Sequence, residues 1–322
     1  MTTNQLTLAI AAGLISAVVF ASATTGPMIL RFVLFFLTPL SLYLAGLGIG
    51  PRGAAIAAFS ATVTILFLTN PLAALVFAVS AGAPAVIATR LTLLGRPLND
   101  EDGAPLEWYP IGRIVLAAAL FGGIFATLAI LIMGGDVEAL GKAMRTLVES
   151  FVKTEMPQIP GAAPLTDAQI DEISKRALGL LPTTLAALSM VTTVLNLWLA
   201  GRITLASERL VRPWPDLSTI ALPSSAAVFL ALAMVAAFMG GLPGLIAGGF
   251  AGALTIAFAI VGLAVAHFMT RGSPWRNFVL AALYTGLVLY TPAIVLLLAV
   301  VGLGETIFSY RARGAPPPAA PD

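Results

Sequence analysis

Residues 277–309 read NFVLAALYTGLVLYTPAIVLLLAVVGLGETIFS, an apolar run that is too long for one membrane-spanning helix. As a single helix rising about 1.5 Å per residue it would reach about 50 Å, whereas the hydrocarbon core of a bilayer is about 30 Å thick. Thr291 and Pro292 lie near its middle. Proline is favoured at the first position of a helix, because the N–H that it lacks has no partner there. The sequence therefore predicts two helices, 277–290 and 292–309, joined by a tight turn.

Three more prolines, Pro27, Pro71 and Pro243, separate neighbouring apolar runs in the same way. The other runs of spanning length occupy residues 6–23, 28–48, 53–69, 71–89, 111–133, 182–201, 224–241 and 243–267. Together with the final pair they predict an all-α fold, a polytopic transmembrane helix bundle of about ten spans. Nine spans, with a kinked last helix, is the alternative.

The composition agrees with a membrane protein, since 59% of the 322 residues are hydrophobic and 10% are charged. A soluble domain needs more charge to solvate its surface. Residues 1–5 contain no Lys or Arg, so the first run lacks the basic start of a signal peptide. We therefore expect that run to remain as a helix.

Several classes of chemistry are excluded by what the sequence lacks. There is no cysteine, and His267 is the single histidine, which excludes thiolate chemistry and a multi-histidine metal centre. No P-loop, G-x-S-x-G elbow or H-E-x-x-H motif occurs. The basic residues have no interleaved aromatics that would indicate nucleic-acid binding. We expect a non-enzyme without cofactor or metal, in which His267 is an interfacial anchor.

The arginines predict the orientation. With the N-terminus inside, eleven of them fall in inner segments: Arg52, Arg90, Arg96, Arg113, Arg202, Arg209, Arg212, Arg271, Arg276, Arg311 and Arg313. The positive-inside rule then places both termini in the cytoplasm, and we expect a bacterial inner membrane. Nine spans would move the last two arginines to the outer side. Residues 1–312 are expected to form one membrane domain, and 313–322 a disordered Pro/Ala-rich tail.

Residues 134–181 predict a helical insert on the outer side. Apolar residues recur at helical spacing through 136–155, which indicates an amphipathic helix. Thr166 and Gln169 form a capping box that opens a second helix, with Ile170, Ile173 and Ala177 on one face. This insert either forms a lid over a pocket or caps the bundle at the membrane surface.

Small residues recur every four positions on the first predicted helix, at Ala9, Gly13, Ala17 and Ala21. Such a stripe lets helix backbones approach closely in lipid. It either docks a partner subunit or packs within the same bundle. A second stripe, Gly244, Gly248 and Gly252, reads as packing within the bundle.

Two polar residues inside apolar runs are candidate ligand-binding residues. Arg31 lies about one turn inside the second run, where a charge must snorkel, pair or line a cavity. It either binds an anionic group or anchors the helix at the interface. Asn196 lies well inside a run and either contacts a ligand or bonds to a neighbouring helix. Pro39 should kink its helix and free a carbonyl group.

Three segments together resemble the YybS-like family of predicted bacterial membrane proteins, whose function is unknown. They are residues 34–50, LFFLTPLSLYLAGLGIG; residues 212–217, RPWPDL, with Leu222 and Pro223; and residues 302–305, GLGE, followed by Tyr310 and Arg311. The matching positions are Pro39, Gly46, Gly50, Arg212, Pro213, Asp216, Gly302, Glu305 and Arg311. The family more often has Asp where this chain has Glu305.

That family is similar in outline to the substrate-binding membrane subunits of energy-coupling-factor vitamin importers. Those subunits dock on a coupling subunit through small residues of their first helix. The resemblance implies that Ala9, Gly13, Ala17 and Ala21 would dock such a partner. Importer subunits have about six spans, so the similarity covers only part of this chain.

Two functions follow as hypotheses. The first is a small-molecule transport component that binds an apolar or neutral solute and relies on a separate coupling or ATPase subunit. The second is a non-transporting scaffold or assembly factor that docks envelope proteins through its outer insert.

Overall fold

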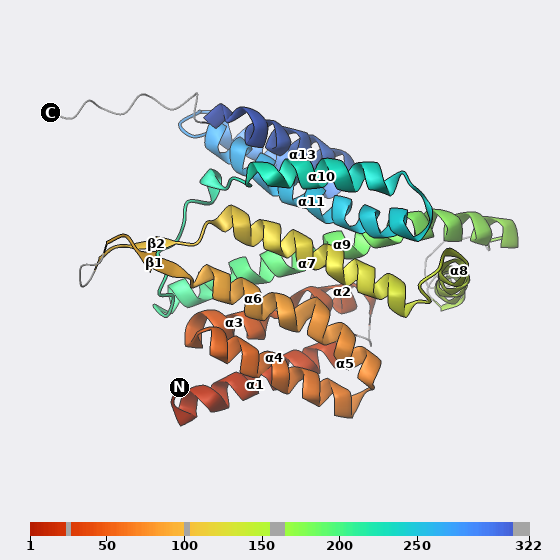
Figure 1. Cartoon of the computed structure of the whole chain (residues 1–322), viewed down its shortest axis with the longest axis horizontal. Coiled ribbons are helices and arrows are strands. Elements are labelled where there is room, and N and C mark those ends of the chain that lie inside the picture. The colour runs from red at the N-terminus through yellow and green to blue at the C-terminus, as the bar shows by residue number, and fades with distance from the viewer. Residues whose placement is uncertain (24–26, 100–103, 155–164, 312–322) are drawn as a thin grey trace.

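The computed structural model describes residues 1–23, 27–99, 104–154 and 165–311, which form a helix bundle with one small hairpin (Figure 1). The helices are α1 (Thr3–Ser22), α2 (Met28–Leu37), α3 (Leu40–Ile49), α4 (Pro51–Leu68), α5 (Pro71–Phe77), α6 (Ala83–Thr92), α7 (Ile111–Ile132), α8 (Val137–Thr154), α9 (Asp167–Ala206), α10 (Ser224–Ala237), α11 (Gly241–Met269), α12 (Arg276–Leu289) and α13 (Thr291–Phe308). A π-helical turn, η1 (Ala78–Gly82), joins α5 to α6, and a 3-10 turn, η3 (Leu217–Thr219), follows α9. The tail expected at 313–322 lies outside the described residues.

Eight helical stretches in the described ranges are long and apolar enough to cross a membrane, with α2–α3 and α5–α6 each forming one stretch. The apolar helices α10 and α12 are shorter, at 14 residues each. Every predicted run is thus helical, and the prediction of an all-α membrane bundle is confirmed. The chain breaks at Tyr290 between α12 and α13, so the last run forms two helices rather than one kinked helix.

The two ends of the bundle differ in charge. The start of α1, the end of α13 and the hairpin lie at one end in Figure 1, and α8 lies at the other. The arginines that were predicted to be on the inner side, as far as the structure describes them, lie in the helix ends, the hairpin and the connecting segments at the first end. We call it the arginine-rich end.

Helix α9 corrects the prediction for residues 166–201. Thr166 and Gln169 form the expected capping box, but the helix then continues for 40 residues to Ala206. Pro182 is buried inside it, where packing keeps the helix continuous although one backbone hydrogen bond is lost. Ile170 is buried, whereas Ile173 is exposed, so the expected apolar face is only partly correct.

A two-stranded hairpin was not predicted. Strands β1 (Gly95–Pro97) and β2 (Leu106–Trp108) pair antiparallel between α6 and α7, with Arg96 opposite Glu107. The Arg96 Nε atom donates to Glu107 Oε2 at 2.6 Å. Three-residue strands are too short to leave a pattern in a polar loop.

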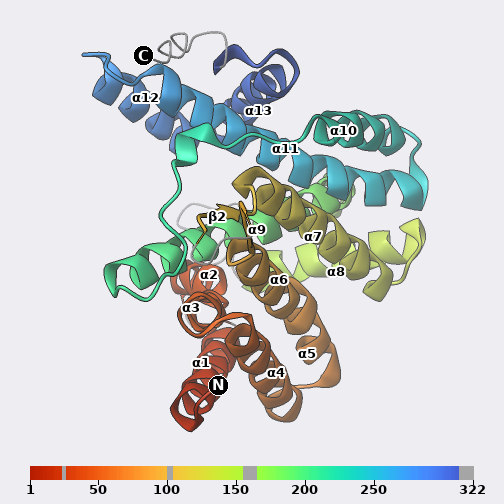
Figure 2. The ribbon, with the colours of Figure 1, turned by 60° about the vertical axis from the view of Figure 1, so that its left-hand side comes forward.

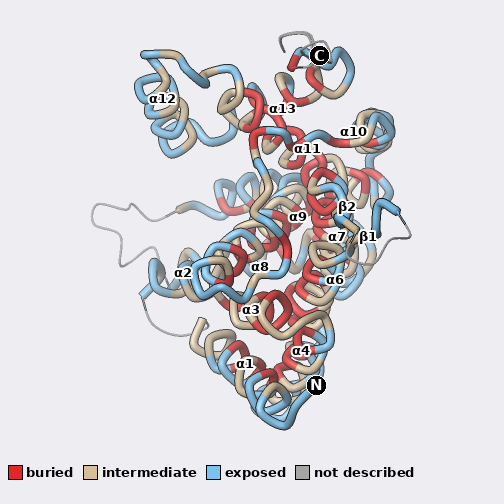
Figure 3. The backbone as a smooth tube through the Cα atoms, turned by 90° about the vertical axis from the view of Figure 1, so that its left-hand side faces the viewer, coloured by how far each residue is buried: buried red, intermediate tan, exposed pale blue. Residues whose placement is uncertain are grey.

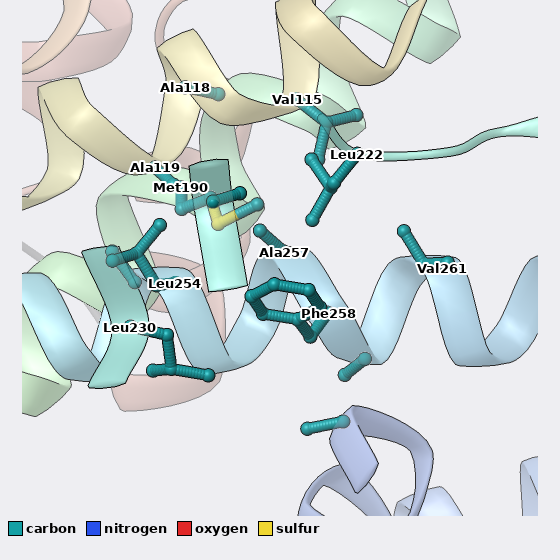
Figure 4. Packing of buried hydrophobic residues seen from close by; sticks show 14 of the residues in the cluster. Val115, Ala118, Ala119, Met190, Leu222, Leu230, Leu254, Ala257, Phe258 and Val261 are labelled. Atoms are coloured by element: carbon teal, nitrogen blue, oxygen red, sulfur yellow. The ribbon is translucent and has the colours of Figure 1, made fainter. Parts of the chain in front are cut away.

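Most of the buried hydrophobic residues form two clusters, one mainly over α1 and α3–α6 and the other over α7, α9, α10, α11 and α13. Figure 3 shows that burial concentrates along the middle of the bundle, on α3, α4, α7, α9 and α11. In the second cluster Met190 of α9 lies close to Leu254 and Ala257 of α11 (Figure 4). The outer faces of α1, α2, α10 and α12 stay apolar and exposed, as expected for helices that face lipid.

Candidate functional site

A cavity of about 1040 Å³ lies between α7, α9 and α11, in their halves nearest to the arginine-rich end. Its walls are mainly apolar, from Ile111, Ile114, Val115 and Ala118 of α7, Val191, Val194, Leu195, Leu197 and Trp198 of α9, and Ile256, Ile260, Leu263 and Ala264 of α11. Its polar lining comes from Thr92, Thr193, Arg212, Asp216, Ser218, His267, Arg271, Arg276 and Tyr284. This size and composition fit a small-molecule binding site.

The cavity arises from a change in residue size along one face of α11. In the half away from the arginine-rich end, Thr183 Oγ1 of α9 donates to the Gly248 carbonyl at 3.0 Å. A Cβ on Gly252 would lie only 2.9 Å from Thr183 Cα, so the two helices are in close contact there. One turn further on, Ile256 and then Ile260 take the place of glycine on this face. Both side chains line the cavity, and side chains of this size keep helix backbones further apart than glycine does.

An extended segment, residues 207–223, crosses the arginine-rich end from α9 to α10, and we call it the strap (Figure 2). Its residues Leu210, Arg212, Trp214, Pro215, Asp216, Leu217, Ser218 and Ile220 line the cavity and form its end wall. Polar contacts attach the strap to three helices that are distant in sequence. Gly112 at the start of α7 also lies against it, because a Cβ there would be 1.7 Å from the Ala221 carbonyl oxygen.

The first attachment is a buried ion pair at the end of α13. Arg311 Nε donates to Glu305 Oε1 at 3.0 Å, and both side chains are less than a tenth exposed. The same guanidinium donates to the strap carbonyls of Ser218 and, at 2.8 Å, of Ile220. Each of its three nitrogen atoms therefore donates a hydrogen bond, and the charge is paired with a carboxylate, as a buried charge requires.

The second attachment joins the strap to the end of α11. Arg271 Nη2 contacts both carboxylate oxygens of Asp216, at 2.7 and 2.5 Å. Asp216 also accepts from the backbone N–H and the hydroxyl of Ser218. The Arg271 guanidinium, and then the Ser218 donors, lower the pKa of the Asp216 carboxyl from 3.8 to about 2.

The third attachment is Arg212, which reaches α6 and the hairpin. Its Nη1 donates to the Thr92 carbonyl at 3.1 Å, and its guanidinium lies 5.8 Å from the centre of the Trp108 ring. Arg212 is only 7% exposed, and burial lowers the pKa of its guanidinium. In the described part of the chain no carboxylate pairs with it.

Helix α12 borders the cavity but packs loosely, and none of its residues is buried. Figure 3 shows it standing apart from α9. At the arginine-rich end, Tyr284 is hydrogen-bonded to His267 Nε2 at 2.8 Å, and Arg276 Nη1 donates to the His267 carbonyl at 2.8 Å. His267, expected as an interfacial anchor, links α11 to α12.

The two residues chosen as ligand candidates do not line this cavity. Asn196 is fully buried, and its Nδ2 donates to the Phe36 carbonyl at 2.6 Å and to the Thr192 carbonyl at 2.7 Å. It bonds to a neighbouring helix, one of the two alternatives given for it. Arg31 lies partly buried in the first turn of α2, outside the cavity lining.

Pro39 breaks the second run into α2 and α3, as predicted. The break leaves carbonyl groups that other helices satisfy. Asn196 bonds to that of Phe36, and Ser16 Oγ of α1 donates to that of Thr38 at 2.6 Å. Side chains of α1 and α9 therefore supply the hydrogen bonds that the break between α2 and α3 leaves open.

The small-residue stripe of α1 lies inside the bundle. Ala9, Gly13 and Ala17 are buried, and Ala21 is half-buried. A Cβ on Gly13 would lie 2.3 Å from the Ala57 carbonyl oxygen of α4. The stripe packs α1 against α4, so a partner could dock on it only by displacing α4.

The motif positions meet at the cavity end or at close helix contacts. The strap is held by contacts of Arg212, Asp216, Glu305 and Arg311. Pro213 lies in the strap between Arg212 and Trp214. A Cβ on Gly302 would lie 1.9 Å from the Phe258 carbonyl oxygen, so α13 and α11 touch there. Gly46 faces Thr89 in the same way, and Gly50 has a φ of 107° that favours glycine. These residues stand out in the sequence, but their spacing does not predict that they meet.

Residues 14–304 match the family described as a predicted membrane protein, DUF2232. No curated protein and no solved structure matches the chain. The matched range runs from the middle of α1 to Gly304 in α13 and includes the strap and every residue that lines the cavity. A chain with this bundle of apolar helices, matched over nearly its entire length, belongs to the DUF2232 family of predicted membrane proteins.

Proposed function

We propose that this protein is the solute-binding component of a transport system in the bacterial inner membrane. The observation that carries the proposal is the cavity of about 1040 Å³ between α7, α9 and α11. A cavity with apolar walls and a few polar groups at one end is typical of a small-molecule site. The arginine-rich end lies in the cytoplasm by the positive-inside rule, with both termini.

A separate partner supplies the energy in this proposal. The sequence has no P-loop, so ATP hydrolysis would fall to a coupling or ATPase subunit. The sequence resemblance to energy-coupling-factor binding subunits implies the same division of labour. Since the α1 stripe is buried against α4, the partner would bind elsewhere on the chain.

A scaffold function is the second candidate, and the insert supports it. Leu140 and Met144 of α8 are buried, and Arg145 pairs with Asp171 of α9, so α8 is held firmly on the bundle. Leu147 and Phe151 of the same helix remain about half exposed. An apolar surface of this kind is suited to contact an envelope protein.

The test is purification of the tagged protein from its native membrane in mild detergent, with mass spectrometry of bound proteins and small molecules. Leu263→Trp fills the cavity, and Leu297→Trp makes the same change on an exposed face of α13. A transport component retains a small molecule that Leu263→Trp loses and Leu297→Trp keeps, together with a coupling or ATPase subunit. Envelope or biogenesis proteins alone, with no molecule lost from Leu263→Trp, would instead support the scaffold.

A further inference from the structure

The arginines around the cavity differ in whether a carboxylate neutralises their charge. Three arginines and one carboxylate line it, so its polar end carries net positive charge. The carboxylate, Asp216, is already paired with Arg271. Nearby, Arg311 is paired with Glu305 behind the strap. Arg212 remains the buried cation of the strap without an acidic partner in the described residues.

Arg212 is fixed in place but retains free donors. A guanidinium has five N–H donors. Within the described ranges its one hydrogen bond is from Nη1 to the Thr92 carbonyl, and Trp108 lies beside it. A buried charge without a partner is costly, and the cost falls when an anion supplies the missing hydrogen bonds. A planar guanidinium matches the oxygens of a carboxylate or phosphate.

Some residues that line the cavity are also exposed at the surface of the bundle. Val191 and Trp198 of α9 line it and are nevertheless 38% and 44% exposed. Tyr284, on the facing side of α12, is 44% exposed and also lines it. The opening therefore lies between α9 and the loosely packed α12. A molecule dissolved in the bilayer reaches the apolar walls without crossing the polar end.

We infer that the cavity binds an amphiphile from the bilayer, with its apolar chain between α9 and α11 and its oxyanion head group on Arg212. The head group is a carboxylate or a phosphate. This inference rests on the proposed function and specifies the solute class. It places the head group at the arginine-rich end, at the depth where the head groups of that leaflet lie.

Intrinsic tryptophan fluorescence provides the test, because Trp198 and Trp214 both line the cavity. Bromine quenches tryptophan on contact, so a dibrominated long-chain fatty acid is titrated into the purified full chain in detergent. Its uncharged methyl ester is titrated in parallel. Arg212→Gln removes the proposed contact. Arg209→Gln removes the same charge from an exposed position of the strap.

We expect saturable quenching by the acid and weaker quenching by the ester in the wild-type protein. Arg212→Gln should weaken acid binding about tenfold or more and leave ester binding unchanged, because only the head-group contact is lost. Arg209→Gln should match the wild type, and Arg212→Lys should retain part of the affinity. Thermal unfolding of each variant separates a lost contact from a lost fold.

Competition by a long-chain alkyl phosphate distinguishes the two head groups, and displacement by either amphiphile supports the inference. Inorganic phosphate alone is the counter-test, since displacement of the acid by millimolar phosphate would assign Arg212 to free anions and overturn it. Equal binding of acid and ester, or equal loss with both arginine variants, would also overturn it. The proposed function would survive these results if the purified protein still carried a solute that Leu263→Trp removes.

Discussion

The two halves of the α9–α11 contact are built on opposite principles. In the half away from the arginine-rich end, Gly252 lets the backbones approach closely at Thr183, whose hydroxyl also bonds to the Gly248 carbonyl. In the half at the arginine-rich end, Ile256 and Ile260 occupy the corresponding positions of α11 and line the cavity. There the structure is closed by charged side chains that hold the strap. The same pair of helices is thus tightly packed in one half and lines a cavity in the other. The stability of each half should be sensitive to different mutations.

The largest effect is expected at the open half, from Arg311→Ala. This change strands the buried Glu305 carboxylate and leaves the Ser218 and Ile220 carbonyls without a donor. Loss of one partner of a buried ion pair costs about 3–5 kcal/mol. Thermal unfolding in detergent measures it. Adding Glu305→Gln should recover part of the loss, and no recovery would show that the strap carbonyls, rather than the stranded charge, dominate.

The packed half should be sensitive to a single methyl group at one position and not at its neighbour. A Cβ on Gly252 would meet Thr183 Cα at 2.9 Å, whereas on Gly248 the nearest atom is Thr183 Oγ1 at 3.7 Å. Gly252→Ala should therefore destabilise by about 1–3 kcal/mol. Gly248→Ala is its control and should be neutral or stabilising by up to about 1 kcal/mol. Equal unfolding temperatures for the two variants would contradict this packing.

On the same face of α11, added volume in the open half should be tolerated. Ile260→Phe directs a larger side chain into the cavity, so we expect a change below about 1 kcal/mol, in contrast to the overpacking cost at Gly252. Unfolding temperature and quenching by the brominated acid are measured together. A stable variant with weakened quenching would show that the space is used for binding. A strong loss of stability would mean that the cavity walls close on each other.

The smallest effect concerns the exposed Asp216–Arg271 attachment, whose side chains are 45% and 50% exposed. The pKa of Asp216 is lowered from 3.8 to about 2 in the folded protein. The stabilisation is therefore present above pH 3.8 and is lost as the pH falls through 2. Fluorescence of Trp214 on the strap should change over this interval. Asp216→Asn should show no such change, and an identical acid transition in that variant would assign it to another group.

How far the sequence predicts this molecule depends on the range of the interactions. Apolar run length and helix-starting prolines predicted the helices, because these are local signals. Continuity of α9 through Pro182 was missed, since tertiary packing overrides the proline. The hairpin was missed because three-residue strands leave no periodic pattern.

The site was less predictable than the helices. Arg212, Asp216, Glu305 and Arg311 stood out as separate motifs, but contacts such as Arg311 to Ser218 link positions 93 residues apart. Spacing along the chain gives no sign of such a meeting. Asn196 stood out as a polar side chain in an apolar run, yet its partner is a carbonyl at the break before Pro39, which only the fold positions.

The distant origin of the strap contacts has a consequence for biosynthesis. The strap leaves the ribosome well before α11 and α13, because the chain is made from its N-terminus. The carbonyls of Ser218 and Ile220 have no bond from Arg311 until that residue, more than ninety positions later, has been synthesised. These two contacts can therefore form only after the final helix has been synthesised. We expect a nascent chain that is stalled before Arg311 to leave the strap unattached at this end and open to proteases.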